Sequence, residues 1–386
     1  MGAEPARDRG LGRAVEDHLL AQAERAHVVR RLGGERRGAV LPLAEGVAGD
    51  VTSLESPRYG TWGFDLSGMD TSVKPGDDFN KFANGAWEKR TTIPADQASA
   101  GVGYDVYNRS QDQLRTLIET ADASTPIGAL YKSFTDEAKV EQVDDAPLKV
   151  DVAAIQAISS KAELAKAMGR AHGGFGPDLF SLDIYADART PEINTLYIGQ
   201  SGLGLPDRDY YLTDGFKPQL DAYKAFAERA LKMTGHADPA KAAADVIAFE
   251  TAIAKVSWPV ADRRDIEKSY NPVTLTELQA YAPEIPWADY LAAAGVTGRD
   301  QVVLGEKTAV RDIAKLFAAT PLETLKAWQT VQGVQEMSPY LSKRFVDSRF
   351  EYVKVLSGQT SLRPRWKRGV QLVDGSLGEL VGVRRQ

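Results

Sequence analysis

Apolar residues recur at helical spacing along most of the chain after residue 59. Thr125-Pro126 places proline at the first position of a predicted helix, and Asp238-Pro239 repeats that arrangement. The apolar residues after the first start share one helix face: Ile127, Leu130, Tyr131 and Phe134. Those after the second start form a stripe that ends before Trp258-Pro259: Val246, Phe249, Ile253 and Val256. Both patterns predict amphipathic helices.

Three further helix starts are marked by capping boxes, in which Ser or Thr is followed three residues later by Glu. They lie at residues 160–163, 274–277 and 320–323. Leu164 and Met168 follow the first box at helical spacing. Leu325 and Trp328 follow the third, and we expect such aromatic residues to belong to the core rather than to bind a cofactor.

One stretch alternates between apolar and polar residues instead. In residues 178–202, DLFSLDIYADARTPEINTLYIGQSG, apolar side chains recur at every second position on either side of a polar turn: Phe180, Leu182, Ile184, Leu196 and Ile198. This alternation predicts a β-hairpin. The fold class expected from the whole pattern is therefore mainly α, a large multi-helix domain with a small β-hairpin.

Residues 1–58 differ in amino-acid composition from the rest of the chain. They are rich in Arg and acidic residues, contain no aromatic residue, and precede the first Lys, Lys74. We interpret them as a poorly ordered leader that need not be native, because Arg-only basic usage is typical of a sequence read from another start or frame. They lack the apolar h-region and cleavage site of a signal peptide.

Composition and charge exclude several classes of protein. The chain has 386 residues, 43% of them hydrophobic and 26% charged, which is typical of a globular protein. A net charge of −6 argues against a nucleic-acid partner. No apolar run reaches the length of a membrane helix, so no membrane span is expected. With no Cys, disulfides, thiolate nucleophiles and Cys-ligated zinc are excluded.

The stretch GLGLPDRDYYLTDG, residues 202–215, is dense in Gly, Asp and Tyr and resembles a phosphate loop at first sight. Gly202 and Gly204 begin a G-x-G-x-x-G pattern, but Asp207 stands where the third glycine is required. Ser201 is followed by Gly202-Leu203, whereas a nucleophile elbow requires Gly at position 203. Neither a phosphate site nor a hydrolase site is predicted.

Other candidate chemistry is equally incomplete. Residues 298–308, GRDQVVLGEKT, miss the spacing of a Walker loop. His172 and His236 have no second His at helical spacing, so we interpret them as helix-terminal or loop residues rather than zinc ligands. Asp207 and Asp209 could form an acid/base pair, but we expect a turn whose carboxylates bond backbone donors and the guanidinium between them.

Four stretches together resemble the N-terminal domain of the neprilysin and endothelin-converting-enzyme family of zinc metallopeptidases, in its bacterial branch. They are PGDDFNKFANGAWEKRTTIP at 75–94, YIGQSGLGLPDRDYYL at 197–212, KSYNPVTLTEL at 268–278 and RPRWKRGVQLVDGSLGELVG at 363–382. Asn84 stands where animal members carry a Cys. The resemblance divides the chain into the leader 1–58, a helical capping domain at 59–382 and a truncated tail at 383–386.

The resemblance implies a non-catalytic part of a zinc metalloendopeptidase. In that family the helical domain encloses the chamber of a C-terminal zinc domain and restricts substrates to peptides. The motif H-E-x-x-H, which is absent here, and the E-x-x-x-D that follows it belong to that C-terminal part, so the zinc and its ligands are expected in the missing catalytic part. The resemblance predicts that GLGLPDRDYYL is the turn that connects the hairpin to the next helical section. In it, Tyr210 and Tyr211 supply apolar rings with polar hydroxyl tips.

No catalytic, metal-ligating or substrate-binding residue is assigned to this chain. Some members place substrate-binding arginines after the Ile-Pro motif, but Arg109 is out of register for that role. The expected partners are the missing zinc domain and, in the complete enzyme, peptides. Complete relatives are exported, yet the compartment stays open here. Two alternatives also stay open: a stand-alone peptide-binding or scaffold module, and a metallopeptidase with different ligands.

Overall fold

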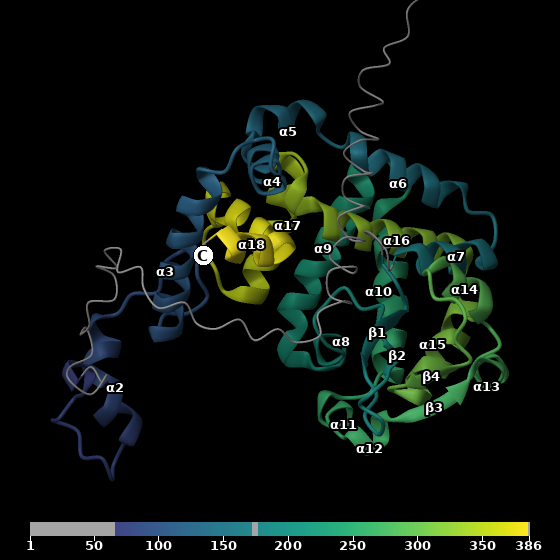
Figure 1. Ribbon diagram of the computed structural model, residues 1–386, viewed down its shortest axis with the longest axis horizontal. Coiled ribbons are helices and arrows are strands. Elements are labelled where there is room, and N and C mark those ends of the chain that lie inside the picture. The colour runs from purple at the N-terminus through teal and green to yellow at the C-terminus, as the bar shows by residue number, and fades with distance from the viewer. Residues whose placement is uncertain (1–65, 172–176, 385–386) are drawn as a thin grey trace, which may run out of the picture.

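The computed structural model describes residues 66–171 and 177–384, and the predicted leader lies outside them (Figure 1). The described chain is mainly α-helical, as predicted. The elements before the sheet are η2 Leu66–Gly68, α2 Phe79–Arg90, α3 Val102–Glu119, α4 Pro126–Thr135, α5 Glu137–Val143, α6 Ala146–Ala157 and α7 Lys161–Ala171.

The remaining helices alternate with short strands and then form the C-terminal fifth of the chain. Those between the strands are α8 Asp209–Leu212, η3 Asp214–Phe216, α9 Lys217–Met233, α10 Pro239–Val256, α11 Val260–Arg263, α12 Ile266–Ser269, α13 Leu275–Tyr281 and α14 Trp287–Ala293. Those after the last strand are α15 Lys307–Ala319, α16 Leu322–Met337, η4 Ser338–Tyr340, α17 Lys343–Ser357 and α18 Arg365–Arg384.

The predicted hairpin is confirmed, but it belongs to a four-stranded sheet of order β1-β2-β4-β3. β1 Phe180–Ala186 pairs antiparallel with β2 Asn194–Gln200, which runs parallel to β4 Gln301–Leu304. β3 Asn271–Thr274 closes the sheet antiparallel to β4. Phe180 is fully buried whereas Ile184 is 66% exposed, so β1 leaves the core toward its turn.

Two of the three predicted capping boxes differ from expectation. At α13 the Thr274 side chain and Glu277 bond each other's backbone, as predicted. Before α7, Ser160 does cap Glu163, but the Glu163 carboxylate accepts from Ser159 instead of Ser160. The prediction of a capping box at 320–323 is wrong, because Thr320 ends α15 and its hydroxyl donates to the carbonyl of Leu316.

Two hydrophobic clusters organise the described chain. The larger one spans the helices from α6 to α17 and the sheet, and it contains both predicted stripes of α10 and α16. The smaller one joins α18 to α3 and α4 through residues such as Ile118, Ile127 and Val370. α2 contributes to neither cluster, and Figure 1 shows it at one end of the molecule, beyond α3.

Candidate functional site

The segment that follows β2 is threaded through the core rather than laid over the surface. Gly202 adopts a positive φ of 97° and accepts a hydrogen bond from the indole nitrogen of Trp328 on α16. The carbonyl of Gly204 accepts hydrogen bonds from Gln335 of α16 and Tyr352 of α17. The stretch singled out in the sequence is thus a connection into α8, as predicted.

The connection is tied to a buried carboxylate, Glu250, which lies in the middle of α10. Its two oxygens accept hydrogen bonds from the Tyr211 hydroxyl at 2.7 Å, the Tyr223 hydroxyl at 3.0 Å and the Gln332 amide at 2.7 Å. The Tyr211 hydroxyl also accepts from the backbone of Gly204 and Leu205. Glu250 and the groups that surround it, which we term the Glu250 network, link α8, α9, α10 and α16.

Burial dominates the electrostatics of this network. Glu250 is fully buried, and desolvation raises its pKa from 4.5 to about 7 although its three donors lower it. Burial and the nearby carboxylate also raise the pKa of the Tyr211 and Tyr223 hydroxyls, which therefore remain donors. The network holds a connection in place, and Glu250 itself has no exposed surface.

We expect Glu250 to make the protein less stable as pH rises from 4.5 to about 7. Below that window the carboxyl is protonated in both states; within it the unfolded chain releases the proton and the folded chain keeps it. The free energy of unfolding should therefore fall by about 3 kcal/mol across the window and then level off.

The non-titrating Glu250→Gln variant is the control for that measurement. Urea unfolding of both proteins between pH 4.5 and 8 should show their stability difference changing with pH. A difference that stays constant over this range would contradict a raised Glu250 pKa.

Beside the Glu250 network lies a cavity of about 610 Å³. We call it the hairpin cavity, because β1 and the start of the connection form one wall and α16 the other. Its lining is mainly polar and includes Asp178, Asp183, Ser201, Gln332, Gln335, Glu336 and Arg349. Gln332 thus belongs both to the cavity wall and to the buried network.

The other candidates from the sequence occupy structural positions. The Asp207 carboxylate accepts from the backbone of Asp209, as predicted, but Arg208 donates to the carbonyl of Ala254 and not to either aspartate. His236 follows α9 in a loop, and His172 lies outside the described residues. Arg109 is exposed on α3.

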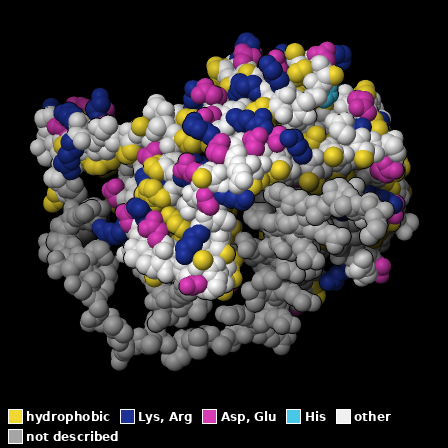
Figure 2. All heavy atoms as spheres, turned by 90° about the horizontal axis from the view of Figure 1, so that it is seen from above, with side chains coloured by type: hydrophobic (Ala, Val, Ile, Leu, Met, Phe, Trp, Pro, Cys, Tyr) yellow, Lys and Arg dark blue, Asp and Glu magenta, His cyan; other side chains and the backbone are white. Residues whose placement is uncertain are grey.

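The described residues do not provide the donors that a zinc site needs. Residues 66–171 and 177–384 contain no group of three or more His, Cys, Asp or Glu placed to hold a metal ion. Within the same ranges no helix combines the length and the apolar character needed to cross a membrane. Figure 2 shows basic and acidic side chains interspersed on the face seen from above, without a stripe of one sign.

Comparisons with known proteins identify the family to which this chain is similar. The family model described as Peptidase family M13 matches residues 75–385. Endothelin-converting enzyme 1 of Rattus norvegicus is 28% identical over 339 residues, which cover 82% of this chain and 44% of the relative. Neprilysin-11 of Caenorhabditis elegans is 28% identical over 341 residues, with coverages of 80% and 40%.

Solved structures of zinc metalloproteases are also similar to this chain. The crystal structure of Mycobacterium tuberculosis zinc metalloprotease Zmp1 in complex with inhibitor superposes with a TM-score of 0.78 at 32% identity, covering 82% of this chain and 50% of that one. PepO from Lactobacillus, at 18% identity and a TM-score of 0.68, shares the fold. The chain spans about half the length of the proteins it matches.

Proposed function

This chain belongs to the N-terminal domain of peptidase family M13, the zinc metallopeptidases, and from that membership we propose that it is the non-catalytic part of a zinc metalloendopeptidase. The resemblance stated from the sequence is thereby confirmed at the level of family. The proposal adds that the helical domain, residues 59–382, closes over a zinc-binding part and encloses a chamber that admits peptides. Every metal ligand would come from that other part.

The observation that carries this proposal is an unsatisfied apolar surface near the start of the described chain. Large apolar side chains that are more than half exposed recur along this part of the chain, on η2, α2, α3 and the loop between the two helices: Leu66, Phe79, Ile93, Val102 and Val106. In α2 only Gly85 is buried. We call these five side chains the leading apolar surface.

Such a surface is costly in water and favours a partner. Each apolar Å² left exposed forgoes about 25 cal/mol, and extended exposed patches promote association. A chain that spans half the length of its relatives and carries this surface is well suited to dock against the other half. The leading apolar surface would lie in that interface, and the hairpin cavity offers polar groups to a bound peptide.

The test is to express this chain with and without the coding sequence that follows it in the genome. We expect the isolated chain to self-associate on size-exclusion chromatography and to cleave no peptide. Together with a downstream H-E-x-x-H part it should form a one-to-one complex that cleaves peptides and stops on chelation. Peptide cleavage by the isolated chain, abolished by a chelator, would refute the proposal.

Substitutions separate docking from folding. Phe79→Asp and Val106→Asp should weaken the complex at least tenfold while leaving the circular dichroism spectrum unchanged. Ile184→Asp is the matched control, because Ile184 is 66% exposed and Phe79 68% exposed, but Ile184 lies on the hairpin. Equal weakening by all three variants would argue against the leading apolar surface. A clean gene end with peptide binding by this chain alone would favour a stand-alone module.

A further inference from the structure

A second cavity, of about 220 Å³, lies between α6, α7 and α16. We call it the α6–α16 pocket. Its walls are mainly apolar: Leu148, Val152, Ala154, Ile155, Ile158, Ala167, Pro177 and Met337. Asp151 and Arg170 also line it, and both side chains are solvent-exposed.

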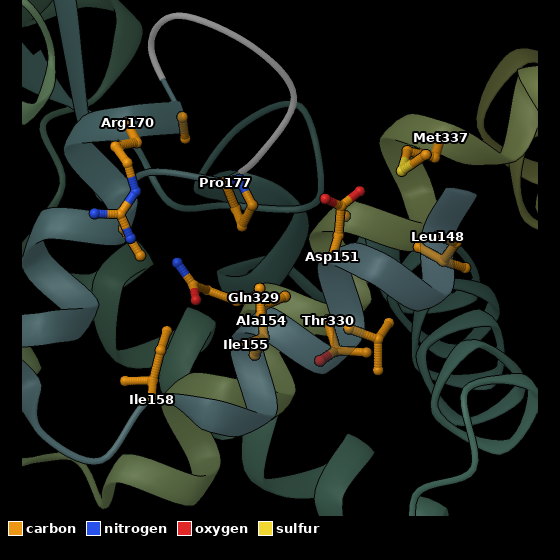
Figure 3. Close-up of a pocket in the computed structure, with 14 residues that line it drawn as sticks. Leu148, Asp151, Ala154, Ile155, Ile158, Arg170, Pro177, Gln329, Thr330 and Met337 are labelled. Carbon is orange, nitrogen blue, oxygen red and sulfur yellow. The ribbon is translucent and has the colours of Figure 1, made fainter. Parts of the chain in front are cut away.

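One polar side chain in this pocket has an acceptor atom that receives no hydrogen bond from the described residues. Gln329 of α16 is only 3% exposed, and its Oε1 atom is buried without a hydrogen bond. Figure 3 shows its carboxamide directed into the space between Arg170 and Ile158. The neighbouring Thr330 hydroxyl does not donate to this Oε1 atom, because it donates to the carbonyl of Lys326.

Buried acceptors in folded proteins are nearly always bonded, and an exception inside a cavity indicates a missing donor. A water molecule or the N–H or O–H group of a bound ligand would supply that donor, and most of the remaining lining residues are apolar. Apolar cavities of roughly 150 Å³ bind benzene, so this larger one has room for a bigger ring system.

We propose that the α6–α16 pocket is a binding site for an aromatic group of one or two rings that carries a single N–H or O–H donor. The ring packs against Val152, Ile155 and Ile158, and the donor bonds the Oε1 atom of Gln329. Indole and phenol are the simplest such groups. They occur as free molecules and as the side chains of Trp and Tyr in peptides, and both sources present the same chemistry to the pocket.

The test uses pairs of ligands that differ only in the donor. Binding of indole and of benzofuran, which has an oxygen in place of the N–H, is measured by ligand-observed NMR on the full chain. Indole should bind about tenfold more tightly, as one hydrogen bond predicts. A third arm with N-acetyltryptophanamide distinguishes the sources: binding as tight as indole favours a peptide side chain, and exclusion favours a free molecule.

Two variants make the test specific. Gln329→Leu removes the acceptor at similar size and should abolish the preference for indole while benzofuran still binds. Gly333→Leu should block the pocket, because a Cβ there meets no atom within 4 Å and the residue lines the cavity. Gly375→Leu, an equally open helical position on α18, is the control and should bind as the wild type does.

Three outcomes would overturn the proposal. The first is that indole does not bind the wild-type chain. The second is that indole and benzofuran bind equally, since Gln329 would then play no part. The third is that binding survives Gly333→Leu in a variant whose circular dichroism spectrum is unchanged.

Discussion

The Gly204→Ala variant is expected to lose about 3 kcal/mol or more of stability. A Cβ at this position would overlap the Oη and Cζ atoms of Tyr223 and lie 2.9 Å from the Nε2 atom of Gln332. Tyr223 is fully buried and its hydroxyl donates to Glu250, so it has no room to withdraw. The connection would have to shift, and its carbonyl bonds to Gln335 and Tyr352 would be lost with it.

Urea unfolding followed by circular dichroism measures this loss. Gly215→Ala is the matched control: it lies eleven residues further along the same stretch, a Cβ there meets no atom within 4 Å, and its φ is not positive. It should unfold within about 0.5 kcal/mol of the wild type. If Gly204→Ala were as stable as Gly215→Ala, the close packing of the connection against Tyr223 would be wrong.

Long periodic elements were predictable from the sequence because their burial follows directly from spacing. Three of the four predicted residues are buried in both the α10 stripe and the α4 face, and the fourth residues, Val256 and Leu130, are half-buried. Strands β3 and β4 were missed since each has four residues, too few for an alternating pattern. The box at 320–323 failed because a Thr, Pro and Glu in the right order fit both the end of one helix and the start of the next.

The Glu250 network was only half predictable. The density of Gly and Tyr in GLGLPDRDYYL marked one side of it, but hydrogen bonds between distant segments leave no local pattern. A usable signal did exist on the other side. Glu250 lies four residues after Val246 and three before Ile253, so it is an acidic residue inside an apolar helix stripe. Such a residue is expected to be buried with partners.

Glu250→Ala is expected to cost about 3–5 kcal/mol, because lost hydrogen bonds and a newly formed cavity add together. The Tyr211, Tyr223 and Gln332 donors would be left without their acceptor, and a cavity would replace the side chain. Glu228→Ala is the control, because Glu228 is exposed on α9. It should change the free energy of unfolding by less than about 0.5 kcal/mol.

A double-mutant cycle with Tyr223→Phe shows whether Glu250 acts through its partners or only through its volume. Tyr223 suits this purpose because its hydroxyl bonds only side chains here: it donates to Glu250 and accepts from the Gln332 amide. The Tyr211 hydroxyl, by contrast, also accepts from two backbone N–H groups. Tyr223→Phe alone should cost about 1–2 kcal/mol. In the Glu250→Ala background it should cost almost nothing, because the unpaired hydroxyl is removed with it, giving a coupling of about 1 kcal/mol or more. Additive losses would mean that the carboxylate only fills space and does not hold the connection through its hydrogen bonds.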